Sequence, residues 1–207
     1  MLNVICFSKD RPLQLEAFID SLGHFSGLPD SAISVIYTCS PEVSYDTLIK
    51  RWPSVDWIAE TDFQADLMAA VERAGDYVLL GCDDVVFKEY FDLNRGIDLL
   101  ASREDVFGFT LRLGTNIRFM PVFERCDDLL VWDWNAAKGS YWRYCWEVSA
   151  TLYRKAFVLD YLKSRDDLSN PNRLEASLAK EIEVGKQNVP PKLASFAKGC
   201  TVTVTVN

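Results

Sequence analysis

Residues 76–87 read DYVLLGCDDVVF, and this stretch decides the fold class. A short apolar run leads into a Gly-Cys step, then into the adjacent carboxylates Asp83 and Asp84, and a second apolar run follows at once. Burying an unpaired carboxylate is costly, so a pair set between two strand-like runs needs a reason. Either a buried strand opens there into a cleft where the pair binds a hard cation, or the pair makes a tight turn through its own hydrogen bonds.

The chain around this stretch alternates strand and helix patterns. Short apolar runs predict strands at residues 2–7, 33–38, 55–58 and 77–80. The segments between them carry apolar residues at helical spacing, as in the face formed by Leu15, Phe18, Ile19 and Leu22. Such alternation with short connections predicts an α/β fold with a mostly parallel sheet covered by helices on both faces.

Polar clusters follow three of these strands. They are Ser8, Asp10 and Arg11, then Thr38 and Ser40, then Asp83 and Asp84. Ligands of parallel sheets bind beyond the carboxyl ends of the strands, so we expect the three clusters to line one site. Asp10 and Ser40 also suit helix caps, and Arg11 suits an exposed helix start, so these interpretations stay open.

The second half of the chain has a different character. Residues 114–146 form a polar, aromatic stretch that holds four of the six tryptophans. Strand patterns are expected at 106–113 and 148–153, and helices near 155–163 and 173–183. The chain ends in TVTVTVN, an alternating pattern typical of an edge strand, which suggests a domain cut from a longer protein.

Composition excludes several classes of protein. The net charge of -8 without a basic block argues against nucleic acid as a partner. No apolar run approaches the ~20 residues of a transmembrane segment, and the N-terminus does not resemble a signal peptide. The six scattered cysteines form no C-x-x-C pair, which predicts reduced thiols in a cytoplasmic protein rather than a zinc site. With His24 as the one histidine, Ser-His-Asp and Cys-His mechanisms are set aside.

The order of strand, FSKDRPLQL (7–15), helix and a later carboxylate pair resembles the nucleotide-sugar half of GT-A glycosyltransferases of the family-2 type. LRLGTN (111–116), WEVSATLYR (146–154) and NPNRLE (170–175) are similar to later motifs of bacterial and viral members. The resemblance covers most of the chain and extends to the N-terminal module of multidomain viral glycosyltransferases. It implies one GT-A domain over 1–207, in which 1–103 bind the nucleotide sugar and 104–207 the acceptor. It also implies a longer polypeptide, located in the host cytoplasm if viral.

The resemblance implies roles for the polar clusters. The acidic Asp-x-Asp motif of the family stands here as Cys82-Asp83-Asp84, so its first acid is absent. Asp84 is expected to bind Mn²⁺ or Mg²⁺, and Asp83 the ribose or a metal-bound water, because a divalent ion stabilises charge on a diphosphate leaving group. The residues expected to contact the UDP-sugar are Ser8, Asp10, Arg11, Thr38, Ser40, Asp83, Arg112 and Arg173.

An inverting transfer needs a base that deprotonates the acceptor hydroxyl. Glu147 is expected to fill this role, because burial among aromatics would raise its pKa, and Asp133 is the second candidate. A structural ion pair of Glu147 with Arg143 or Arg154 stays open. The expected platform for a sugar acceptor is Trp132, Trp134, Trp142, Tyr144 and Trp146, with ordinary core packing as the alternative.

These features predict a metal-dependent hexosyltransferase that uses UDP-glucose or UDP-rhamnose and a glycan or glycoprotein acceptor. Two alternatives stay open. One is a nucleotidyltransferase that forms nucleotide sugars, although the chain has no Gly-rich basic loop after its first strand. The other is a non-catalytic carbohydrate-binding module, which would have no need of a carboxylate pair at a strand end.

Overall fold

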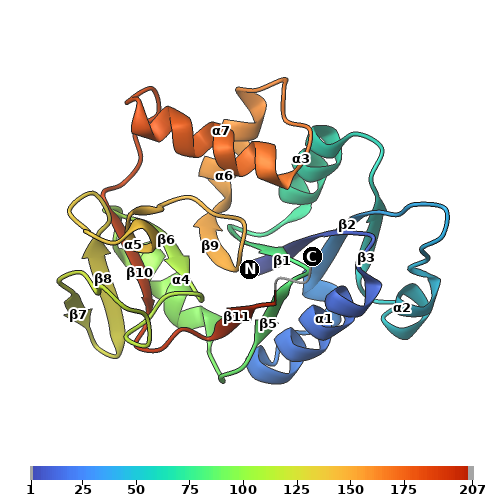
Figure 1. Cartoon of the computed structure of the whole chain (residues 1–207), viewed down its shortest axis with the longest axis horizontal. Coiled ribbons are helices and arrows are strands. Elements are labelled where there is room, and N and C mark those ends of the chain that lie inside the picture. The colour runs from blue at the N-terminus through green and yellow to red at the C-terminus, as the bar shows by residue number, and fades with distance from the viewer. Residues whose placement is uncertain (1, 205–207) are drawn as a thin grey trace.

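The computed structural model describes residues 2–204. Nine strands form one sheet in the order β3-β2-β1-β4-β9-β6-β10-β8-β7 (Figure 1). Their bounds are β1 Leu2–Lys9, β2 Ile33–Thr38, β3 Asp56–Ala59, β4 Tyr77–Cys82, β6 Val106–Thr110, β7 Glu124–Cys126, β8 Leu129–Asp133, β9 Thr151–Arg154 and β10 Lys192–Phe196. A second sheet pairs β5 Val85–Phe87 with β11 Thr201–Thr203. The helices are α1 Pro12–Ser26, α2 Asp46–Arg51, α3 Phe63–Arg73, α4 Leu93–Ser102, α5 Ser140–Arg143, α6 Lys155–Lys163 and α7 Pro171–Glu183, with a short 3₁₀ turn at Asp30–Ala32.

The first half of the sheet is parallel. β1 pairs with β2 and β4, and β2 pairs with β3, all in parallel register. β9 lies antiparallel between β4 and β6, and β8 and β7 extend the sheet antiparallel beyond β10. The predicted mostly parallel α/β sheet is confirmed, and its antiparallel strands all come from the second half of the chain.

Helices cover both faces of the sheet. α1, α2 and α4 pack on one face through residues such as Leu15, Phe18 and Leu99. α3, α6 and α7 pack on the other through residues such as Leu67 and Leu162, and Figure 1 shows these three helices gathered on one side. Buried apolar faces at helical spacing therefore hold the sheet between two cores.

The second half departs most from the sequence expectations. Strands β7, β8 and β10 were not predicted, and the strand expected at 148–153 begins only at Thr151. The alternating C-terminal pattern forms a strand at Thr201–Thr203, and residues 205–207 of that pattern lie outside the described residues. Within residues 2–204, no helix is both long and apolar enough to cross a bilayer. The six cysteines carry free thiols.

Candidate active site

A cleft of about 830 Å³ opens at the carboxyl ends of the parallel strands. Its lining comes from the segments that follow β1, β2, β3 and β4 and from the segment that starts α7; these are residues 7–11, Ile36 and Thr38, Glu60, residues 82–84, residues 148–149, residues 169–172 and Glu175. Of the polar clusters after β1, β2 and β4, every member except Ser40 thus lines one cleft, as expected for a parallel sheet.

Asp83 is anchored to the end of β1. Its backbone N–H donates to the Phe7 carbonyl at 3.1 Å, and its carboxylate accepts from Ser8 Oγ at 2.8 Å. Arg11 Nη1 lies 3.6 Å from Asp83 Oδ1. Burial raises the pKa of Asp83, while Ser8 and Arg11 act against that rise. The Asp83 carboxylate is therefore held in place by Ser8, and its negative charge is partly balanced by Arg11.

Tyr45, a core residue, contacts Ser8, the hydrogen-bond partner of Asp83. It is only 2% exposed, and its hydroxyl lies 2.7 Å from Ser8 Oγ while accepting from the Arg11 backbone N–H at 3.1 Å. Tyr45 lies just before α2 and links the apolar core to Ser8. The signal available in the sequence is that a buried Tyr needs a partner for its hydroxyl.

Asp84 has a different environment. Among the described residues, no side chain forms a hydrogen bond or an ion pair within 4.0 Å with its carboxylate. Burial raises its pKa, with Arg11 lowering it in part. Asp84 therefore presents carboxylate oxygens to the cleft that a ligand can use.

This donor set fits a divalent cation bound together with a phosphate ligand. Over residues 2–204, no group of three or more His, Cys, Asp or Glu side chains is placed to hold a metal alone. Mg²⁺ typically takes one or two carboxylates, keeps several waters, and uses phosphate oxygens for the rest. Asp84, with Asp83 beside it, matches that pattern.

The ends of β1 and β2 are joined by Asp10. The Asp10 backbone has φ 56°, and its Oδ1 accepts from the Ser40 backbone N–H at 2.6 Å and from Ser40 Oγ at 2.8 Å. These bonds lower the pKa of Asp10. Neither residue caps a helix: α1 starts after Arg11, which makes no side-chain cap, and α2 begins only at Asp46. Asp10 thus lines the wall of the cleft, and Ser40, which is not among the lining residues, holds the Asp10 carboxylate in place.

Beside this wall, Thr38 and Glu60 line the cleft at the ends of β2 and β3. Burial is the main cause that raises the pKa of Glu60. Apolar Phe7 and Ile36 complete this side of the cleft. A hydroxyl and a carboxylate over an apolar floor can bind a flat heterocycle.

Glu175 lies in the wall that α7 contributes to the cleft. Its Oε1 accepts from the Tyr144 hydroxyl at 2.8 Å, and its Oε2 accepts from the Val148 backbone N–H at 3.0 Å. Burial raises the pKa of Glu175. A half-buried carboxylate held by two neutral donors can accept a proton from a bound hydroxyl.

Sequence reasoning missed Glu175, although it lies in the NPNRLE segment. The available signal was its place beside Leu174 and Leu178, which form the buried face of α7. Glu175 lies at the margin of this face and is half-buried. In the same segment, Asn170 caps the helix by accepting from the Arg173 backbone N–H at 2.8 Å.

Glu147 lies outside the residues that line the cleft. It is 5% exposed, and its carboxylate accepts from Thr110 Oγ1 at 2.8 Å, Thr151 Oγ1 at 2.6 Å and Arg112 Nε at 2.7 Å. The structure corrects two expectations here, because Glu147 has no oxygen open to an acceptor and the Arg112 guanidinium is engaged by Glu147. The structural ion pair was anticipated, but its partner is Arg112 rather than Arg143 or Arg154.

The tryptophans form core rather than an open platform. Trp132, Trp142 and Trp146 are at most 1% exposed, and Trp134 is 8% exposed. A buried ring offers no face to a sugar, so the expected open aromatic cleft is wrong for these four. Tyr144, at 36% exposed, is the member of the expected platform that reaches the surface beside the cleft residue Glu175.

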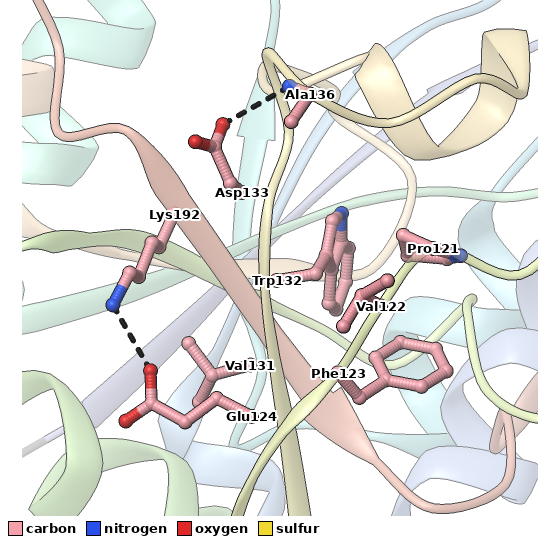
Figure 2. A pocket seen from close by; sticks show the side chains of 9 residues that line it. All are labelled: Pro121, Val122, Phe123, Glu124, Val131, Trp132, Asp133, Ala136 and Lys192. Atoms are coloured by element: carbon pink, nitrogen blue, oxygen red, sulfur yellow. Dashed lines mark hydrogen bonds and ion pairs between the residues drawn. The ribbon is translucent and has the colours of Figure 1, made fainter.

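Asp133 lies at a separate hollow of about 380 Å³ near the β7–β8 edge of the sheet. Figure 2 shows Asp133 turned toward Ala136, whose backbone N–H it accepts at 3.1 Å, and Lys192 paired with Glu124. None of the residues lining this hollow lines the cleft. Asp133 therefore caps a local turn at a distance from the strand ends that carry the carboxylate pair.

Arg173 lies on the outer side of α7. Its guanidinium is exposed and donates to Asp167 Oδ2 at 2.9 Å. Asn170 and Asn172 line the cleft in this segment, and Arg173 does not. The expected contact of Arg173 with a diphosphate would require it to leave Asp167.

The strand order and the carboxylate pair at the end of β4 define a GT-A-like glycosyltransferase fold, and known proteins show the same fold. No protein-family model matches the chain. The bifunctional glycosyltransferase pgtA of Dictyostelium discoideum is 25% identical in an alignment 210 residues long, gaps included, that covers 84% of this chain and 27% of that protein. The chain thus spans about a quarter of its relative's length.

Solved structures agree on the fold. TarS of S. aureus (residues 1–349) in complex with UDP has a TM-score of 0.57 at 14% identity, covering 97% of this chain and 59% of that one. A mannosyltransferase from Pyrobaculum calidifontis with GDP-Man and Mn²⁺ has a TM-score of 0.55 at 14% identity, covering 87% and 52%. A cytidylyltransferase from Leptospira borgpetersenii also shares the fold, with a TM-score of 0.53 at 12% identity, covering 98% and 81%.

Proposed function

We propose that this chain is the catalytic domain of a metal-dependent glycosyltransferase that moves a hexose from a nucleoside-diphosphate sugar to a glycan or glycoprotein acceptor. One observation carries the proposal: an open carboxylate, Asp84, and a second half-buried carboxylate, Glu175, line the same cleft at the strand ends. The first suits a cation with a diphosphate, and the second suits proton removal from an acceptor hydroxyl.

Different residues of the cleft would bind different parts of the nucleoside-diphosphate sugar. The nucleobase of the donor would occupy the side of the cleft formed by Phe7, Ile36, Thr38 and Glu60. The diphosphate of the donor would lie toward Asp84. Arg11 is 40% exposed and lies at the longer distance of 3.6 Å from Asp83, so it can turn to phosphate oxygens when the donor binds. We retain UDP-glucose and UDP-rhamnose as the proposed donors. We add Glu60, which the sequence analysis did not single out, as a residue that contacts the nucleobase.

A bound Mn²⁺ or Mg²⁺ would stabilise the charge that develops on the departing nucleoside diphosphate. Glu175 takes the proton of the acceptor hydroxyl while that oxygen forms the new bond to the anomeric carbon. The bond from the anomeric carbon to the diphosphate breaks with its electron pair, so attack from the opposite face inverts the centre. We propose Glu175 for this role instead of Glu147, because the Glu147 carboxylate is closed by Thr110, Thr151 and Arg112.

The acceptor would enter beside Tyr144. The Tyr144 hydroxyl orients Glu175, and its part-exposed ring adjoins that carboxylate. A pyranose C–H face can pack on such a ring, which would place one of its hydroxyls near Glu175.

Titration calorimetry with UDP, GDP and CTP, each with and without Mn²⁺, tests the proposal. We expect UDP to bind at least tenfold more tightly with Mn²⁺, and Asp84→Ala to abolish that difference while retaining metal-free binding. Failure of both diphosphates to bind under either condition would overturn the proposal. Tight CTP binding with pyrophosphate release from a sugar phosphate would instead identify a nucleotidyltransferase.

A further inference from the structure

The adjacent residues Asp83 and Asp84 are held by different parts of the chain. Asp83 is fixed to β1, which belongs to the start of the chain. The Asp84 carbonyl instead accepts from the Val204 backbone N–H at 2.7 Å. The backbone of the proposed cation ligand is therefore tied to the last described residue of the chain.

The pairing of β11 with β5 brings Val204 to this position. The two strands are antiparallel, with Thr201 opposite Phe87 and Thr203 opposite Val85. One further step places Val204 opposite Asp84, and Figure 1 shows β11 running beside β5. The contact with Asp84 thus continues the register of a strand pair and is not an isolated approach.

The other end of this segment is clasped by the LRLGTN segment. The Cys200 backbone N–H donates to Leu111 O, the Thr115 N–H donates to Ala197 O at 2.8 Å, and the Gly199 N–H donates to Asn116 Oδ1 at 2.8 Å. These bonds fix residues 197–200 before the chain enters β11.

Two glycines make the clasp possible. A Cβ on Gly114 would lie 2.3 Å from the Gly199 nitrogen, and a Cβ on Gly199 would lie 2.5 Å from the Arg112 carbonyl oxygen. Both contacts are to backbone atoms that have no flexible end to move away. Only glycine at both positions allows the two backbones to approach this closely.

We propose that residues 197–204 form a tether whose last N–H, on Val204, positions Asp84 for the divalent cation of the nucleotide complex. This inference rests on the proposed function, in which Asp84 is the cation ligand. Asp84 belongs to a two-residue turn between β4 and β5, and among the described residues no other side chain orients its carboxylate. The direction of the carboxylate therefore follows the direction of its backbone, which the tether sets. Val204 is a positioning residue that acts through Asp84.

The substitution Val204→Pro tests the tether, because proline removes the N–H and suits the extended conformation that precedes it. The matched control is Val204→Ala, which retains the N–H. We expect Val204→Pro to weaken Mn²⁺ binding to the UDP complex roughly tenfold, as loss of an outer-shell partner does. Metal-free UDP affinity should stay within about twofold, and Val204→Ala should match the parent protein in both. Mn²⁺ binding is read by electron paramagnetic resonance and UDP binding by calorimetry.

A second variant, Asn116→Ala, releases the Gly199 N–H at the far end of the tether and should weaken Mn²⁺ binding in the same direction. Parent-level Mn²⁺ affinity in both Val204→Pro and Asn116→Ala would overturn the tether. Equal loss of metal-free and metal-dependent UDP binding would overturn it also, since that points to general disruption. Unchanged Mn²⁺ affinity in Asp84→Ala would instead show that the proposed metal role has failed, whatever the tether does.

Discussion

At the scale of single residues, the buried Glu147 and the half-buried Glu175 differ in how their carboxylates are held. Glu147 has its oxygens satisfied by two hydroxyls and a guanidinium in the core. Glu175 faces the cleft and is held by one hydroxyl and one backbone N–H. The same substitution at the two positions should therefore produce different losses.

Glu175→Gln should lower the transfer rate by roughly 10²–10⁴-fold while UDP affinity stays unchanged, because an amide cannot accept the acceptor proton. Burial raises the pKa of Glu175, and a base works only when ionised. The rate of the parent protein should thus fall as the pH drops through that raised pKa, at higher pH than for an ordinary glutamate. Product mass spectrometry across a pH series measures both effects.

Glu147→Gln is the matched comparison. Removing one partner of a buried ion pair typically costs about 3–5 kcal/mol, and Arg112 would keep its charge without a counterion. We expect a lower free energy of unfolding in urea, with the remaining folded protein still active. A Glu147→Gln protein with normal stability but no transfer activity would restore Glu147 as the proposed catalytic base.

At the scale of elements, the wall of the cleft depends on how α7 is placed. The loop between α6 and α7 is held by Gln64 of α3, whose side-chain amide donates to Leu162 O at 3.0 Å and to Arg165 O. The Gln64 Oε1 accepts from the Leu168 N–H at 3.1 Å. A side chain of the first half thus fixes the approach to the helix that carries Glu175.

Gln64→Glu should loosen this loop, because a carboxylate cannot donate to the two carbonyls and repels them. The cost of leaving buried acceptors unpaired is about 1–3 kcal/mol. Hydrogen–deuterium exchange over residues 162–172 should rise, and KM for the acceptor should increase more than KM for the donor. Gln14→Glu on α1 is the control for the added charge. Exchange rates that stay at the parent level in Gln64→Glu would contradict this role.

The sequence predicted the elements of the first half well, and local physics explains why. The strand at Ile33–Thr38 and the buried face of α1 followed from short-range patterns. The antiparallel placement of β9 and the partner of Glu147 did not, since both depend on residues far apart in the chain. The position of Asp83 and Asp84 at the cleft could be predicted because strand ends meet at one edge. The contact of the Val204 N–H with the Asp84 carbonyl could not, because every residue except proline carries a backbone N–H and the sequence does not show which one is used.

At the scale of the whole molecule, two cores on opposite faces of one sheet carry the stability. The tryptophans expected to bind sugar belong to one of these cores. Trp142 is fully buried, with its ring 5.0 Å from that of Trp132 and its Nε1 donating to Arg118 O at 3.1 Å.

Trp142→Ala should therefore lower the free energy of unfolding by about 3–5 kcal/mol, as large cavities do. Tyr141→Ala, at a neighbouring residue that is 61% exposed, should change it by at most about 0.5 kcal/mol. Urea denaturation of both variants measures the difference. A stable Trp142→Ala protein that has lost acceptor binding would restore the sugar-platform interpretation.

β9 lies between β4 and β6 in the middle of the sheet, although it comes from the second half of the sequence and is synthesised after both of these strands. Until residues 151–154 are in place, the apolar β4 has an unpaired edge, which is the kind of surface on which chains aggregate. Pairing across so long a stretch of sequence also slows folding, since the loop entropy is lost before the contacts form. A nascent chain that has emerged only through α4 would thus leave the edge of β4 open to misassembly, and a chaperone that shields β4 until synthesis reaches β9 would raise the yield.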